Sequence, residues 1–141
     1  MAAKSTLKDH VIVCGYGIVG QRVVETLVEN GVPFIVIELD SQKVDNVKKR
    51  GYEALQGDAT KERMLKDAGI KSAKAVAIVM DNDAKNLFAV LAAKDLNEGI
   101  FIATRANDDA VREKLVEAGA DYIVMPQKAA SEEITEEIIK S

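Results

Sequence analysis

The chain of 141 residues is long enough for one globular domain, and its balance of 48% hydrophobic and 30% charged residues is typical of such a domain. A formal net charge of −4, without a basic stripe interleaved with aromatic residues, argues against a nucleic-acid partner. One cysteine excludes an intramolecular disulfide, and no apolar run approaches the roughly 18 residues that span a membrane. A lone cysteine and the lack of a signal peptide lead us to expect a cytoplasmic domain.

The N-terminal part of the chain carries a glycine motif directly after an apolar strand. Residues 1–9 are polar, and we expect them to form a leader or linker outside the core. The first expected strand, Val11–Cys14, leads into GYGIVG at 15–20, which opens a helix over about Val19 to Asn30. In such a G-x-G-x-x-G motif the first glycine permits a sharp turn and the second leaves room for a pyrophosphate. The third allows the helix to pack closely on the sheet. The phosphates would lie at a helix N-terminus, which favours anions.

The second expected strand, Phe34–Glu38, ends in an acid 18 residues beyond Gly20. At about this distance an acid accepts hydrogen bonds from an adenosine ribose. This combination favours a site for a dinucleotide or adenine nucleotide, because the glycine motif lies between a strand and a helix and an acid ends the second strand. The alternative is a domain of the same fold whose glycines serve only packing.

Apolar strands and amphipathic helices continue to alternate along the chain. The expected elements are a helix capped by Ser41 and ending near Arg50, strand Glu53–Gln56, a helix near Glu62–Ala68, strand Ala75–Val79, a helix near Ala84–Leu96, strand Ile100–Thr104, a helix capped by Asp108 or Asp109 and ending near Ala118, strand Tyr122–Val124, and a final helix from Pro126 to about Lys140. This rhythm predicts an α/β fold with a doubly wound, mostly parallel six-stranded sheet in the order 3-2-1-4-5-6.

Polar residues follow three further strands at the edge where such sheets bind ligands. Asp58, after the third strand, would meet the adenine or cap the next helix. Asp81 and Asp83, after the fourth strand, offer carboxylates for a divalent cation, although Asp83 also suits an N-cap. Arg105 ends the fifth strand and would face a phosphate or pair with an acid.

The sequence shows no residue grouping typical of nucleophilic or hydride-transfer catalysis. His10 is the only histidine, and we expect it on the surface at the start of the first strand, far from the ligand edge. A nicotinamide dehydrogenase normally needs a second domain for its substrate. We therefore expect a domain that is not an enzyme, with a fragment of an NAD-dependent oxidoreductase as the alternative.

Two helices carry more apolar surface than one sheet face can cover. The segment Leu87–Ala93 is apolar all round. Ala130, Ile134 and Ile138 repeat every four residues on a terminal helix otherwise rich in glutamate. Both features predict self-association. The alternative is that each stripe packs locally.

These residues resemble the RCK or KTN family (TrkA-N-like), the cytosolic regulatory domains of potassium channels and of Trk/Ktr-type potassium transporters. The resemblance runs from Asp9 to Lys140. It rests on GYGIVG, VIELD, QGDAT, AVAIV, TRAN and AGADYIVMP. The Gly-Asp-Ala-Thr turn and the Gly-Ala-Asp…Pro ending are more specific than the glycine motif.

The resemblance implies a Rossmann-like nucleotide-binding domain over residues 10–125 and a dimer-crossing helix over residues 126–141. Such a domain would bind NAD(H), AMP, ADP or ATP, pair into homodimers within a larger ring, and gate potassium flux through a channel or transporter membrane subunit by dimer rearrangement. It would lie on the cytoplasmic side, held at the membrane through that partner. The candidate nucleotide-binding residues are Gly15, Tyr16, Gly17, Ile18, Val19, Gly20, Glu38, Asp58, Ala59 and Arg105.

This chain departs from the family pattern at one informative position. Several transporter-type relatives carry an arginine directly after the second glycine, where this chain has Ile18. The change favours a dinucleotide or monophosphate over a triphosphate. Some relatives bind calcium through acids that resemble Asp58, Asp81 and Asp83, so a calcium-sensing gating domain is a further alternative. The smaller C-terminal lobe of many members has no counterpart in these residues.

Overall fold

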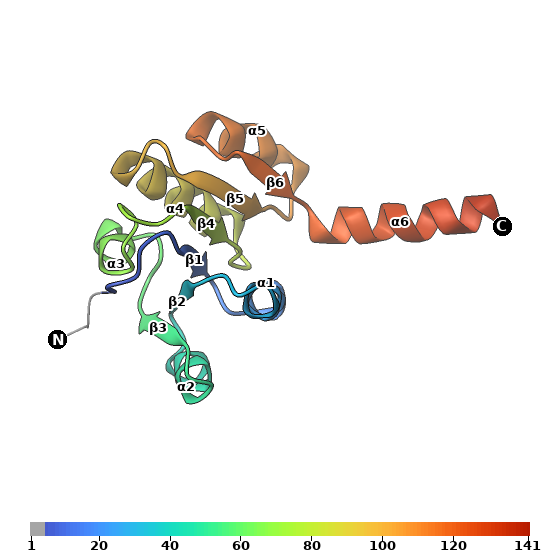
Figure 1. Ribbon diagram of the computed structural model, residues 1–141. Helices are drawn as coiled ribbons and strands as arrows, with labels where there is room; N and C mark the ends of the chain where they lie inside the picture. Colours follow the sequence, from blue (N-terminus) through green and yellow to red (C-terminus); the bar gives the residue numbers. More distant parts are fainter. Residues whose placement is uncertain (1–4) are drawn as a thin grey trace.

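A computed structural model describes residues 5–141 as one domain built on a six-stranded, all-parallel sheet (Figure 1). The strands are β1 (Val11–Cys14), β2 (Phe34–Glu38), β3 (Glu53–Gln56), β4 (Ala75–Ile78), β5 (Phe101–Arg105) and β6 (Tyr122–Val124). The helices are α1 (Ile18–Glu29), α2 (Ser41–Lys49), α3 (Glu62–Asp67), α4 (Asp83–Leu96), α5 (Asp109–Ala118) and α6 (Pro126–Lys140). The strand order β3-β2-β1-β4-β5-β6 confirms the predicted topology.

Successive side chains of the strands enter two separate apolar layers, because side chains alternate across a sheet. Val13 and Val36 lie in the layer covered by α1 and α2. Ile12 and Cys14 lie in the larger layer, which α3, α4 and α5 cover (Figure 1). Cys14 is fully buried, and this burial raises the pKa of its thiol to about 12.

The predicted placement of the N-terminal segment and of His10 is wrong. His10 is fully buried, and its Nε2 lies 2.7 Å from the carbonyl oxygen of Ala68. Leu7 packs against the larger core, and the Ser5 amide donates to the carbonyl oxygen of Asp67. Residues 5–9 therefore run along the domain and are not a free linker. Residues 1–4 of the predicted leader lie outside the described residues.

Two predicted helix caps lie one residue away from the actual caps. Asp40, not Ser41, caps α2 by accepting the amide of Gln42. Asn82, not Asp83, caps α4 by accepting the amide of Lys85. The carboxylate of Asp83 is therefore free to bond elsewhere.

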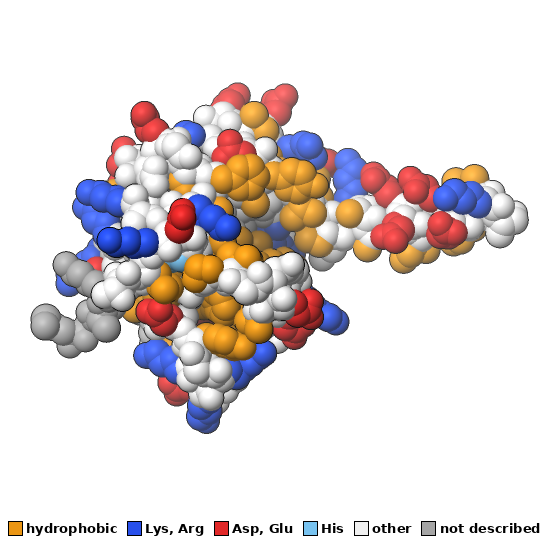
Figure 2. Space-filling model, in the orientation of Figure 1, with side chains coloured by type: hydrophobic (Ala, Val, Ile, Leu, Met, Phe, Trp, Pro, Cys, Tyr) orange, Lys and Arg blue, Asp and Glu red, His pale blue; other side chains and the backbone are white. Residues whose placement is uncertain are grey.

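The terminal helix α6 projects from the body of the domain (Figure 1). It buries none of its residues, and Ile134 and Ile138 are 62% and 65% exposed. Hydrophobic atoms stand between its acidic side chains in Figure 2. Phe88 and Leu91 on α4 are also exposed. No helix within residues 5–141 is long and apolar enough to cross a membrane.

Candidate functional site

A cavity of about 660 Å³ opens at the carboxyl ends of the strands, around the position where the strand order reverses. Open α/β sheets bind ligands at this position. Eight of the predicted site residues line the cavity: Gly15, Tyr16, Gly17, Ile18, Glu38, Asp58, Ala59 and Arg105. Val19 and Gly20 lie outside its lining.

The glycines of the loop have different neighbours, and these fix the roles they can have. Gly15 turns the chain with φ +105°, a conformation that favours glycine. A Cβ atom on Gly20 would collide with the carbonyl oxygen of Gly15. Gly20 therefore allows the helix to pack against the loop, whereas the prediction was that it allows the helix to pack against the sheet. A Cβ atom on Gly17 would meet nothing within 4 Å. The open side of the loop is therefore at Gly17.

Helix α1 begins at this loop without a side-chain cap. Its N-cap is Gly17, and its first turn contains no acidic residue. In contrast, Asp40, Asn82 and Asp108 cap α2, α4 and α5. The amides that open a helix need acceptors, and the positive end of the helix dipole favours an anion. The N-terminus of α1 therefore offers a place for a phosphate in the cavity.

Glu38 lies at the end of β2 and points back to the glycine loop. One carboxylate oxygen accepts the amide of Tyr16 at 2.8 Å, and the other accepts the amide of Asp40 at 2.8 Å. These two bonds fix the carboxylate while leaving lone pairs for further donors, such as ribose hydroxyls. The side chain of Tyr16 packs into the smaller core, so its backbone is the part next to Glu38.

Asp58 lies in the turn after β3. One of its carboxylate oxygens accepts the hydroxyl of Thr60 at 2.6 Å and the amide of Thr60 at 2.9 Å. These bonds, with smaller contributions from the charges of Lys61 and Lys85, lower the pKa of Asp58. Asp58 thus holds the turn and presents an ionised carboxylate to the cavity.

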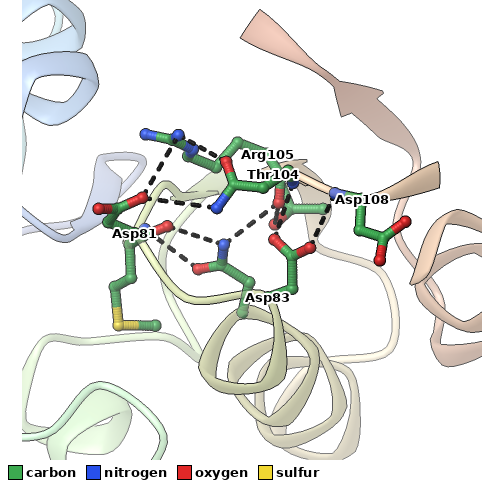
Figure 3. Close-up of polar contacts among 8 residues, drawn as sticks. Asp81, Asp83, Thr104, Arg105 and Asp108 are labelled. Carbon is green, nitrogen blue, oxygen red and sulfur yellow. Dashed lines mark hydrogen bonds and ion pairs between the residues drawn. The ribbon is translucent and has the colours of Figure 1, made fainter. Parts of the chain in front are cut away.

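A polar network holds Arg105 at the end of β5 (Figure 3). Its Nη2 donates to Asn107 Oδ1 at 2.7 Å and lies 3.7 Å from Asp81. The two carboxylate oxygens of Asp83 accept the amides of Asn107 and Asp108. Asp83 therefore links the start of α4 to the loop that holds Arg105. The sequence analysis, which considered Asp83 as an N-cap, did not predict this role.

The sequence analysis did not name several residues of the cavity lining, and three of these have long polar side chains. Lys43 and Lys85 lie in the first turns of α2 and α4, directly after strands that end at the cavity. The reasoning that placed Asp58 and Arg105 at the ligand-binding edge of the sheet would also have identified both lysines. Gln127, in the first turn of α6, also lines the cavity. Its place depends on the path of α6, which no local sequence pattern reveals.

The carboxylates considered for calcium do not form a common ligand set. Asp58 bonds Thr60, Asp81 pairs with Arg105, and Asp83 bonds backbone amides. Over the part of the chain that the structure describes, no group of three or more His, Cys, Asp or Glu side chains converges to hold a metal ion.

The family model described as the TrkA-N domain matches residues 11–126, from the first strand to the start of α6. The chain belongs to the TrkA-N family. This TrkA-N domain is 40% identical over 128 residues to Probable potassium channel protein 2 of Methanocaldococcus jannaschii. The match covers 86% of this chain and 36% of that protein, so the chain spans about a third of the relative's length.

Solved structures agree with the TrkA-N assignment. The crystal structure of the TrkA-N domain of inner membrane protein ybaL from Escherichia coli has a TM-score of 0.90 at 29% identity, covering 94% of this chain and 98% of that one. Two structures below 25% identity share the fold. They are the Shewanella denitrificans Kef CTD in AMP-bound form, with TM-score 0.82, 24% identity and coverage of 93% and 79%, and the GsuK channel bound to NAD, with TM-score 0.78, 17% identity and coverage of 87% and 22%.

Proposed function

We propose that this TrkA-N domain is the nucleotide-sensing regulatory part of a potassium channel or a Trk/Ktr-type potassium transporter. NAD(H) or an adenine nucleotide binds in the cavity at the glycine loop. The bound nucleotide acts as a switch ligand and is not consumed. It changes the arrangement of paired domains and thereby the potassium flux through the membrane partner, with the domain on the cytoplasmic side.

The observation that carries the proposal is the free N-terminus of α1 beside the open backbone of Gly17. A phosphate there would accept hydrogen bonds from amides that no side chain within residues 5–141 caps. Glu38, fixed at the end of β2, lies where a ribose attached to that phosphate would offer its hydroxyls. A phosphate site and a hydroxyl acceptor on neighbouring strands are the two recognition elements of an adenine nucleotide.

The proposed partner and pairing have separate support. One relative is a probable potassium channel protein in which the matching segment is a minor part, so the remainder of that protein would carry the channel. Exposed apolar side chains on α4 and α6, including Phe88 and Ile134, offer surfaces for pairing. Contiguous exposed apolar surfaces of this kind mark interaction sites.

A melting screen tests the ligand. NAD+, NADH, AMP, ADP, ATP and calcium would each be added to the chain. A true ligand at about 100 times its dissociation constant adds roughly 2.7 kcal/mol of stability and raises the melting midpoint by several degrees. Isothermal titration calorimetry then gives the affinity. We expect nucleotides, and not calcium, to stabilise the domain.

The Gly17→Val variant checks the position of the site. Gly17 has an extended backbone with φ −83°, and a Cβ there meets no atom within 4 Å, so the variant should fold. Its side chain would occupy the space that a phosphate needs, and nucleotide binding should be lost. A folded variant that binds with unchanged affinity would show that the phosphate site lies elsewhere.

A further inference from the structure

Helix α6 is joined to the rest of the domain by very few contacts. It follows β6 after a single residue, Met125, and none of its own residues is buried. Among the side-chain hydrogen bonds and ion pairs within residues 5–141, one alone connects α6 to another element. In this pair the Nζ of Lys128 donates to Oδ1 of Asp109 at 3.3 Å. The direction in which α6 leaves the domain (Figure 1) therefore depends largely on the backbone at Met125 and on this pair.

The backbone of Asp109 is held in place independently of α6. Asp109 is the first residue of α5, and the loop before it is bound to α4, because Asp83 accepts the amide of Asp108 at 3.0 Å (Figure 3). Asp108 in turn caps α5 by accepting the amide of Ala110. The positive end of the α5 dipole favours the carboxylate of Asp109. The domain thus offers α6 a well-supported anion.

Lys128 has no comparable support from its own helix. It lies in the first turn of α6, where the positive end of the helix dipole disfavours a cation. In the described chain it pairs with Asp109 on α5 and not with Glu132, one turn further along its own helix. The side chains of Lys128 and Asp109 are 50% and 67% exposed, and such a pair is weak. A weak pair is enough here, because no other side-chain bond of the described residues sets the direction of α6.

We propose that the ion pair between Asp109 and Lys128 is a clamp that sets the direction of α6 and thereby the arrangement in which two copies of the chain pair. The clamp acts on the base of the helix, while the exposed Ile134 and Ile138 lie further along it. Without the clamp, α6 would present these isoleucines over a range of positions. Ordering them on pairing would then cost conformational entropy. The inference rests on the pairing proposed above and does not require a bound nucleotide.

Spin labels measure the direction of α6 directly. One label is placed at Glu117→Cys on α5 and the other at Glu136→Cys on the side of α6 opposite Ile134, and both positions are exposed. Pulsed electron paramagnetic resonance then gives the distribution of distances between the two helices. Cys14 is buried and does not compete for the label. With an excess of unlabelled chain, so that the distance lies within one copy, we expect one narrow distribution.

Removing either charge should broaden this distribution. Asp109→Asn and Lys128→Gln keep the size of the side chain at exposed positions, so both variants should fold. Exchanging the two residues, Asp109→Lys with Lys128→Asp, should restore a narrow distribution, which a local effect of either substitution would not do. Arg22→Gln is the matched control, because it breaks an exposed ion pair, with Glu25, that does not involve α6. It should leave the distribution narrow.

Pairing gives a second readout. Asp109→Asn and Lys128→Gln should each raise the dissociation constant of the dimer in sedimentation by up to about fivefold, the upper end for one exposed ion pair. The exchange should reverse this effect. A narrow distribution in both single variants, or a broad one after the exchange, would overturn the clamp and leave the proposed pairing in place. A monomeric unmodified chain would overturn the pairing and the second half of this proposal, and the distance distributions would still decide the first half.

Discussion

Gly17 and Gly20 lie on the same loop, yet adding a methyl group should destabilise the fold at Gly20 and have little effect at Gly17. In Gly20→Ala the new Cβ meets the carbonyl oxygen of Gly15, and the backbone must shift. We expect a loss of about 1–3 kcal/mol in the free energy of unfolding, as for other overpacked sites. Gly17→Ala should stay within about 0.5 kcal/mol of the unmodified chain. Urea unfolding measures both, and equal stabilities would contradict this account of the loop.

Glu38 should discriminate between NAD and NADP. A 2′-phosphate would be forced against a carboxylate that two backbone amides hold in place. We expect NAD to bind at least tenfold more tightly, or about 1.4 kcal/mol. Glu38→Gln removes the charge at the same size and should narrow the difference in calorimetric titrations. Equal affinities of the unmodified chain for the two dinucleotides would remove Glu38 from the ribose site.

The ionisation of Asp58 should make the stability of the domain depend on pH. Its pKa is lowered in the folded state, chiefly by the hydroxyl of Thr60, so it stabilises the fold above its ordinary pKa. This contribution is lost as the pH falls through the lowered pKa. Thr60→Val should move the pKa of Asp58 upward. It should also reduce stability at neutral pH more than in strong acid.

Carboxyl NMR titration gives the pKa of Asp58 directly, and urea unfolding at the two pH values gives the stability difference. Thr135→Val is a suitable control, because its hydroxyl bonds Ser131 within an exposed helix. An unshifted pKa of Asp58 in Thr60→Val would show that the backbone bond from Thr60 is sufficient.

At the scale of elements, the missing cap of α1 is a feature that a substitution can reverse. Gly17→Asp would place a carboxylate at the N-cap, where it can accept the amides that we assign to a phosphate. The free domain should gain about 0.5–2 kcal/mol relative to Gly17→Ala. Stabilisation by nucleotide should disappear. Melting curves of both variants with and without AMP test this, and an Asp variant that AMP still stabilises would contradict it.

The elements themselves could be predicted because each signal is local. The spacing of apolar residues and the glycines at helix ends determine the twelve elements, and their alternation determines the strand order. The burial of His10 could not be predicted, since it depends on Ala68 in a distant turn. The same holds for Gln127, which reaches the cavity only because α6 starts beside it. Site residues at strand ends follow from topology, whereas those contributed by a projecting helix do not.

For the whole molecule, the exposed apolar stripe of α6 predicts assembly. Ile134 and Ile138 are exposed. Burying these side chains against a second copy of the chain has a lower free energy than leaving them in water. We expect sedimentation at high micromolar concentration to show a dimer or larger species. Ile134→Lys should shift it toward the monomer.

Glu136→Gln is the matched control for this variant. It changes the charge by the same amount on the opposite side of the helix, and it should leave the assembly intact. A monomeric unmodified chain, or equal effects of the two substitutions, would show that the stripe of α6 is not an interface.

The attachment of α6 also gives the molecule a mechanical property. Met125, at its base, is buried in the larger core, and Lys128 in the first turn pairs with Asp109 of α5, while no residue of the helix itself is buried. Fifteen residues at about 1.5 Å each make an arm about 22 Å long, so a turn of about 10° at Pro126 moves the far end by about 4 Å. Gln127 lies next to this pivot. A ligand that displaces the first turn by a fraction of an ångström would thus produce a much larger movement at Ile138.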